Sequence, residues 1–113
     1  MYTSLVLFRN ELKNRQIPLY KIVGIISVLL LSKEIFPHNE DIKEFLANVL
    51  SLSFREYVFR SRTLLVARVT RAIISKSENK EFKKRLYDFI DTNIEKMKKE
   101  KNIKENNKLD GWM

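Results

Sequence analysis

The sequence predicts an all-α fold, a compact single-domain bundle of about five helices. The chain has 113 residues, of which 44% are hydrophobic, and a chain of this size can bury roughly two-thirds of its unfolded surface in one core. Only two Gly and two Pro occur, which leaves little material for hairpins and favours long helices with short connections. Apolar residues recur three and four positions apart, the spacing of one helix face. We expect residues 1–99 to form the bundle domain and residues 100–113 a flexible C-terminal tail.

The first helix is predicted near residues 3–15. Leu5, Phe8 and Leu12 form one apolar stripe, and the polar residues between them are expected to face solvent. Pro18 ends this helix, because a residue that precedes proline avoids the helical region, and the same proline suits the first turn of the next helix.

The second helix is predicted near residues 18–35 and is the most apolar part of the chain. Within residues 22–31 only Gly24 and Ser27 interrupt a run of aliphatic side chains. A helix that is apolar on every side has to be surrounded, so we place it at the centre of the bundle. The uncharged span 22–32 covers about 16 Å of the ~30 Å needed to cross a bilayer, which predicts a core helix and no membrane span. Because Gly weakens a helix by ~1 kcal/mol relative to Ala, Gly24 indicates a closely crossing helix.

Three more helices follow. The third is predicted near residues 40–50, with Asn39 as its N-cap and apolar side chains at the spacing of a helix face: Ile42, Phe45, Leu46, Val49 and Leu50. The fourth is a long basic helix near residues 54–75, opened by a capping box of Ser53 and Glu56. The fifth is predicted near residues 78–99, with one apolar stripe: Phe82, Leu86, Phe89 or Ile90, and Met97, with Ile94 close by.

The positive charge of the chain is concentrated in the fourth helix. Residues 54–76 carry six cations against Glu56 alone, which accounts for +5 of the formal net charge of +8. A clear positive balance suggests an anionic partner such as nucleic acid. The alternative is that Lys-rich, Asn-rich and Ile-rich usage reflects an AT-biased genome, in which case the charge has no binding role.

A helical wheel places Arg60, Arg68 and Arg71 together on the side opposite the apolar face, with Tyr57 beside them and Lys76 following. Guanidinium groups at one-turn spacing can follow a phosphate backbone, and the tyrosine ring can stack on a base. The alternative is an ordinary solvated face, in which Glu56 pairs with Arg60 and acids of the fifth helix, Asp88, Asp91 or Glu95, pair with the remainder.

Arg55 and Arg62 fall within the apolar sector of the same wheel. An unpaired guanidinium cannot stay in a dry core, so each needs a carboxylate, backbone carbonyls or an interface. We therefore expect an exposed helix edge there, a buried ion pair with Glu40, Asp41 or Glu44 as partner, or a subunit interface or ligand pocket. A helix-turn-helix is a further possibility, with the fourth helix as the reader after the short link 51–53.

Catalytic chemistry has no support in the sequence. Cys is absent, His38 has no second His to join it, and no Gly-rich phosphate loop or set of acids at metal-ligand spacing occurs. We expect a protein that is not an enzyme, with no cofactor and no metal. No secretory signal is evident, so a cytoplasmic location is expected.

The sequence thus supports two hypotheses. The first is a small non-enzymatic accessory or regulatory protein that binds DNA or RNA through an arginine-rich helix. The second is a protein-interaction or homo-oligomerisation module whose apolar fourth-helix surface is partly exposed and which makes no nucleic-acid contact.

Overall fold

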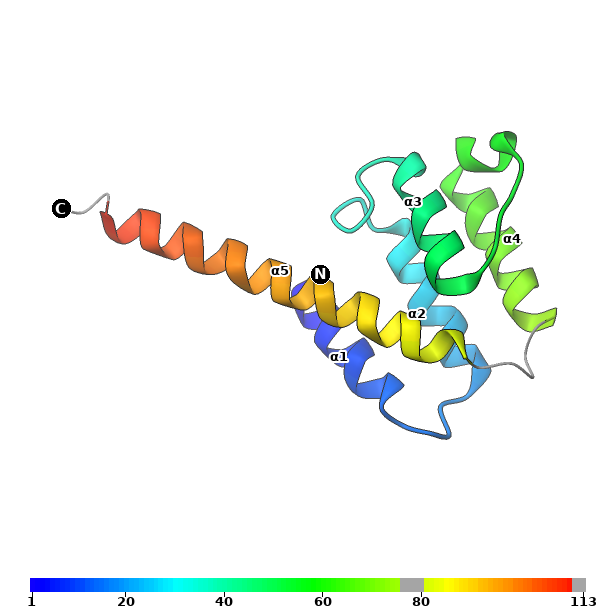
Figure 1. The fold of residues 1–113 in the computed structure, drawn as a ribbon, viewed down its shortest axis with the longest axis horizontal. Coiled ribbons are helices and arrows are strands. Elements are labelled where there is room, and N and C mark those ends of the chain that lie inside the picture. Colours follow the sequence, from blue (N-terminus) through cyan, green and yellow to red (C-terminus); the bar gives the residue numbers. More distant parts are fainter. Residues whose placement is uncertain (76–80, 111–113) are drawn as a thin grey trace.

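The computed structural model describes residues 1–75 and 81–110, with side chains as far as Lys101, and all of its regular structure is helical (Figure 1). The elements are α1 (Tyr2–Leu12), α2 (Leu19–Leu31), α3 (Asn39–Phe45), a π-helical turn η1 (Leu46–Leu50), a 3₁₀ turn η2 (Glu56–Arg60), α4 (Arg62–Ser75) and α5 (Phe82–Asp110). The predicted all-α bundle of five helices is confirmed. None of the described helices has the length and apolar character that a bilayer crossing requires.

One core joins all of these elements. In α5 the buried side chains are four positions apart, at Phe82, Leu86, Ile90 and Ile94, and this stripe lies against α1 and η1. The helices α2 and α4 pack side by side and run in opposite directions, because the first residue of α4 reaches the last turn of α2. Each fully buried aliphatic side chain contributes about 1.5–3 kcal/mol, so this core is the main source of stability.

Three phenylalanine rings join the loop after α2 to α3 and α5. The ring centroids of Phe36 and Phe45 are 5.2 Å apart, those of Phe36 and Phe89 are 5.8 Å apart, and those of Phe45 and Phe89 are 4.6 Å apart. Tilted and offset rings at these separations add to the energy of area burial. The cluster connects α3 to α5, with Phe36 and Phe45 buried and Phe89 half-buried.

The apolar helix predicted near residues 18–35 is present as α2, but it is covered on one side only. Tyr20 is 72% exposed and Leu31 is 55% exposed, so the expectation of an enclosed helix is wrong for this side. Gly24 lies on the same open side, and a Cβ atom built there would have no heavy atom within 4 Å. The expected closely crossing helix is therefore absent at Gly24.

The long basic helix predicted near residues 54–75 is interrupted. Residues 51–55 are irregular, η2 is one short 3₁₀ turn, and Ser61 is extended before α4 begins. Ser61 is the N-cap of α4, since its Oγ accepts the backbone N–H of Leu64 at 3.3 Å. The predicted capping box of Ser53 and Glu56 does not form at the start of η2. With residues 51–61 between η1 and α4, the short turn of a helix-turn-helix is not formed either.

The last helix, α5, is longer than predicted. It runs to Asp110, not to a point near Lys99, and its second half extends away from the bundle (Figure 1). The described molecule therefore measures 57 × 35 × 19 Å. A helical backbone does not measure mobility, so the flexible tail of residues 100–113 stays a prediction.

Gly24→Ala should raise the free energy of unfolding by about 1 kcal/mol, because Ala has the higher helix propensity and its methyl group meets no neighbour at this site. The free energy would be measured by urea unfolding. Ala67→Gly, at an exposed position of α4, is the matched control and should lower stability by a similar amount. A loss of stability in Gly24→Ala would contradict the open environment of Gly24.

Candidate functional site

The residues predicted to bind nucleic acid come from η2 and α4. Tyr57 and Arg60 belong to η2, and Arg68 and Arg71 lie on the outer side of α4. All four are exposed, and Tyr57 retains 47% of its accessible surface. Arg68 Nη2 donates to Tyr57 Oη at 3.3 Å, so the two elements meet at this pair. Among the described side chains no hydrogen bond joins Arg60 to Arg68 or Arg71, so the helical wheel's grouping of the three is not reproduced by direct contact. We call Tyr57, Arg60, Arg68 and Arg71 the basic surface; Lys76 lies outside the described residues.

No described carboxylate neutralises the arginines of the basic surface. Among the side chains described, Arg60, Arg68 and Arg71 have no Asp or Glu oxygen within 4.0 Å. Arg55, which is also exposed, has none either. The positive field of these groups is therefore unreduced by short-range pairing.

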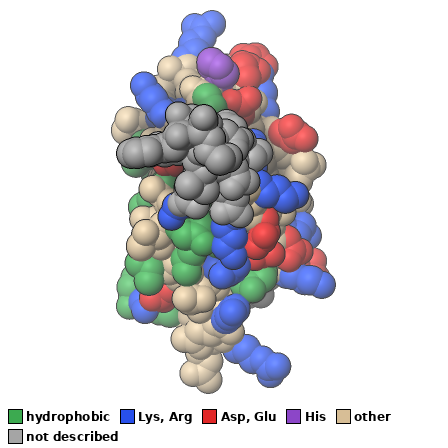
Figure 2. Space-filling view, turned by 90° about the vertical axis from the view of Figure 1, so that its left-hand side faces the viewer, with side chains coloured by type: hydrophobic (Ala, Val, Ile, Leu, Met, Phe, Trp, Pro, Cys, Tyr) green, Lys and Arg blue, Asp and Glu red, His purple; other side chains and the backbone are tan. Residues whose placement is uncertain are grey.

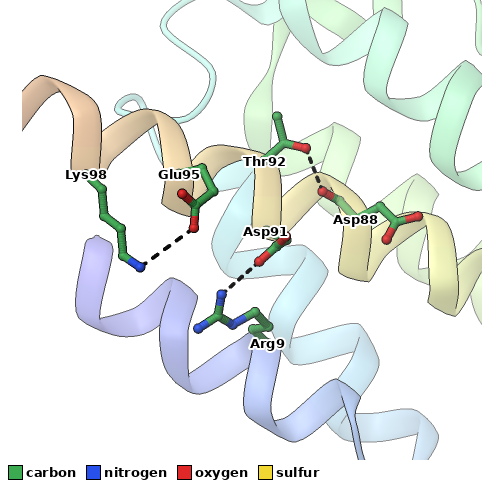
Figure 3. A network of polar contacts seen from close by, with 6 residues as sticks. All are labelled: Arg9, Asp88, Asp91, Thr92, Glu95 and Lys98. Atoms are coloured by element: carbon green, nitrogen blue, oxygen red, sulfur yellow. Dashed lines mark hydrogen bonds and ion pairs between the residues drawn. The ribbon is translucent and has the colours of Figure 1, made fainter.

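Three of the four acids proposed as partners of these arginines are bound elsewhere, and the carboxylate of the fourth, Asp88, forms no ion pair among the described side chains. Glu56 accepts from Lys43 Nζ at 2.6 Å and does not pair with Arg60. On α5, Asp91 binds Arg9 of α1 at 2.8 Å, and Glu95 lies 3.6 Å from Lys98 (Figure 3). The hydrogen bond that Arg9 donates to Asp91 raises the pKa of Arg9 above its ordinary value. The Arg9–Asp91 pair joins α1 to α5, and none of these acids pairs with Arg60, Arg68 or Arg71.

Charge is distributed differently on the face towards which α5 projects. There Lys and Arg side chains lie interspersed with Asp and Glu (Figure 2). Opposite charges that alternate over a surface cancel beyond about one Debye length, ~8–10 Å at ordinary ionic strength. The basic surface, with no carboxylate paired to its arginines, is the better candidate for binding an anion.

Lys43 fixes η2 to α3. Its Nζ lies 2.9 Å from Glu40 and 2.6 Å from Glu56, and it stands 5.1 Å from the centroid of the Phe59 ring. The hydrogen bond with Glu56, and then that with Glu40, raises the pKa of Lys43 above the ordinary lysine value. These contacts attach η2, which carries Tyr57 and Arg60, to α3 and so to the bundle.

Arg62 has a different environment from the other arginines. Its half-buried guanidinium donates to the carbonyl oxygens of Leu30 at 2.7 Å, Ser32 at 3.5 Å and Phe36, and its Nε donates to Asn39 Oδ1 at 2.5 Å. The guanidinium of Arg62 is therefore bound by backbone carbonyl oxygens and one side-chain amide. Among the described side chains it has no carboxylate partner, so the ion pair expected with Glu40, Asp41 or Glu44 does not form at Arg62. The carbonyl oxygens of Leu30 and Ser32 lie at the C-terminal end of α2. The helix dipole also favours a positive charge at this end.

Asn39 connects this cluster to η2. While its Oδ1 accepts from Arg62, its Nδ2 donates to the carbonyl oxygen of Phe59 at 2.7 Å. Asn39 is not the N-cap of α3, because that place is taken by His38, whose backbone N–H donates to Asp41 Oδ2 at 3.0 Å. Sequence reasoning missed this role, since no local pattern relates Asn39 to Arg62.

No family model, curated protein or solved structure matches this chain. Within residues 1–75 and 81–101, no three His, Asp or Glu side chains are grouped so that they could hold a metal ion. Function therefore has to be inferred from the geometry and charge described above.

Arg62→Met should lower the free energy of unfolding by about 2–3 kcal/mol, since hydrogen bonds to a charged group contribute about 1.5–3 kcal/mol and the carbonyls of Leu30 and Phe36 would lose their donor. Arg62→Lys should recover little, because an ammonium group cannot span the same acceptors. Urea unfolding measures both values. Arg60→Met, two positions away and exposed, is the control and should change stability by no more than about 0.5 kcal/mol. Equal losses at the two positions would contradict the structural role of Arg62.

Proposed function

We propose that this protein binds DNA or RNA through the basic surface and acts as a small non-enzymatic accessory or regulatory protein of the cytoplasm. The observation that carries the proposal is the exposure of Arg60, Arg68 and Arg71 with no described carboxylate within 4.0 Å, in a chain of formal net charge +8. Arginine suits this role because its planar group can make two parallel hydrogen bonds to phosphate.

The spacing of the groups supports contact with a nucleic-acid backbone. Arg68 and Arg71 are three positions apart on α4, which places their Cβ atoms about 5–6 Å from each other. Phosphates of one strand follow each other at about 3.4 Å along a duplex axis, so long side chains at this spacing can reach neighbouring phosphates. Tyr57, with its hydroxyl bound to Arg68, presents a ring on which an unpaired base can stack.

The surface is also held in place before any ligand arrives. Lys43 binds Glu56 at one end of η2, and Asn39 binds the carbonyl of Phe59 at the other. Groups that are already ordered lose less conformational entropy on binding. An ordered platform that carries exposed guanidinium groups can bind a phosphate backbone without recognising its sequence.

Fluorescence anisotropy with labelled single-stranded DNA, duplex DNA and RNA tests the proposal. The wild type should bind at low salt and weaken steeply as salt rises. In the Arg60→Gln/Arg68→Gln/Arg71→Gln variant the slope of log K against log salt should fall by about two to three units, since each phosphate contact contributes ~0.7–0.9. Tyr57→Ala should weaken single-strand binding about tenfold, which corresponds to the ~1–3 kcal/mol of one stacked base.

The matched control removes the same charge elsewhere. Lys33→Gln/Lys96→Gln/Lys99→Gln replaces three exposed cations outside the basic surface and should lower the affinity by no more than about twofold, as expected for screened, distant charges. Circular dichroism confirms that each variant is folded. The same loss in both triple variants, or no binding of any nucleic acid at low salt, would exclude the proposal.

The second candidate function is homo-oligomerisation, and α2 favours it more than α4 does. The apolar face of α4 is occupied by the core, with Leu65, Val69 and Ile73 buried, whereas Tyr20 and Leu31 of α2 are exposed. Exposed apolar side chains grouped on one helix are typical of an interface. Light scattering at high protein concentration tests this candidate, because a strict monomer excludes it.

A further inference from the structure

A second concentration of positive charge lies at a cleft formed by α1 and α5, elements other than those of the basic surface. The cleft is formed where the end of α1 meets the first turns of α5, and it has a volume of about 540 Å³. Four cationic side chains line it: Lys13, Arg15, Lys83 and Lys84. We call it the basic cleft.

Hydrogen bonds to Asn14 shape one wall of the basic cleft. The carbonyl oxygen of Asn14 accepts from Lys83 Nζ at 2.6 Å and from the backbone N–H of Ile17 at 3.2 Å. Its side-chain Oδ1 accepts the backbone N–H of Gln16 at 3.0 Å. The turn after α1 is thereby folded tightly and attached to α5, and this brings Lys13 and Arg15, the two neighbours of Asn14, to the rim.

The charge of the basic cleft favours an anion. Glu81 is the one acid that lines it, against four cations. Among the described side chains, no carboxylate lies within 4.0 Å of Lys13, Arg15 or Lys84, and all three are exposed. Unpaired cations that line the same open depression repel one another and attract a counter-ion.

The remaining wall of the basic cleft is not charged. Leu12 is buried and Tyr87 is half-buried, and together they give the cleft an apolar and aromatic side. A volume of about 540 Å³ exceeds what a lone phosphate fills and matches pockets for small organic ligands, ~300–1,000 Å³. Such a site suits a ligand with an anionic end and a planar end.

We propose that the basic cleft binds a nucleoside phosphate, with its phosphate groups at Lys13, Arg15 and Lys84 and its base against Tyr87. The ligand has two possible sources, a free nucleotide or the phosphorylated end of a nucleic-acid strand. Binding of a free nucleotide is independent of the function proposed above, whereas binding of a strand end rests on it.

Isothermal titration calorimetry with ATP, adenosine and inorganic phosphate tests the cleft. ATP should bind the wild type, and adenosine and phosphate should each bind at least about tenfold more weakly, since each supplies only one of the two kinds of contact. In Lys13→Gln/Arg15→Gln/Lys84→Gln the affinity for ATP should fall about tenfold or more. If that variant loses its helical circular dichroism, Arg15→Gln alone, at an exposed position, replaces it.

Two control variants separate the cleft from the basic surface. Lys33→Gln/Lys96→Gln/Lys99→Gln and Arg60→Gln/Arg68→Gln/Arg71→Gln remove the same charge and should leave ATP affinity within about twofold of the wild type. The same loss in either control, no binding of ATP to the wild type, or binding of phosphate as tight as that of ATP would overturn the proposal.

A pair of oligonucleotides with and without a 5′-phosphate identifies the source. Tighter binding of the phosphorylated strand, lost in the cleft variant only, assigns the cleft to strand ends. Equal binding of the two strands together with ATP binding assigns it to free nucleotides. If no oligonucleotide binds while ATP does, the function proposed for the basic surface is excluded and the proposal for the basic cleft is retained. If oligonucleotides bind through the basic surface and ATP does not bind, only the proposal for the basic cleft is excluded.

Discussion

The guanidinium of Arg62, inserted among backbone carbonyl oxygens, is the interaction on which the arrangement of this protein depends. The acceptors belong to the last turn of α2 and to the loop that follows it, groups that a helix cannot satisfy internally. Through Asn39 the same side chain reaches the carbonyl of Phe59 in η2. One charged group thus joins α2, the loop before α3, η2 and α4. The position of Tyr57 and Arg60 follows from it, because η2 is too short to be stable by itself.

Two other cations act in the same way. Arg85 Nε of α5 donates to the carbonyl oxygen of Val49 at the end of η1 at 2.9 Å, and Lys83 donates to Asn14 just beyond α1. Each of them satisfies a carbonyl where a helical segment ends, and each draws two elements together. Part of the formal charge of +8 is therefore structural. Net charge by itself does not identify a binding surface; the cations that remain exposed and unpaired are the informative ones.

The sequence was sufficient for the fold class and for the buried stripes, because the spacing of apolar residues and the scarcity of Gly and Pro are local properties. It was not sufficient for the segment 54–75. A wheel drawn through these residues assumes an unbroken helix, whereas Ser61 caps a new helix and Arg60 belongs to the preceding turn. The partners of Arg62 were also out of reach, since Leu30 and Asn39 are brought to it only by the tertiary fold. The prediction at Gly24 is wrong because a glycine that lowers helix propensity does not by itself require a close neighbour, and α2 is open on that side.

The positive field of the basic surface arises from where the acids of this chain are bound. Glu56, the acid nearest in sequence to Arg60, is held by Lys43, and Asp91 of α5 is held by Arg9. Glu11 of α1 likewise pairs with Lys21 of α2. Each of these pairs joins two elements, so the fold itself keeps these carboxylates in place. An ion pair at the surface is worth little in stability, ~0–1 kcal/mol. Its larger effect here is on the distribution of charge, because every acid that connects two helices is one that cannot neutralise Arg60, Arg68 or Arg71.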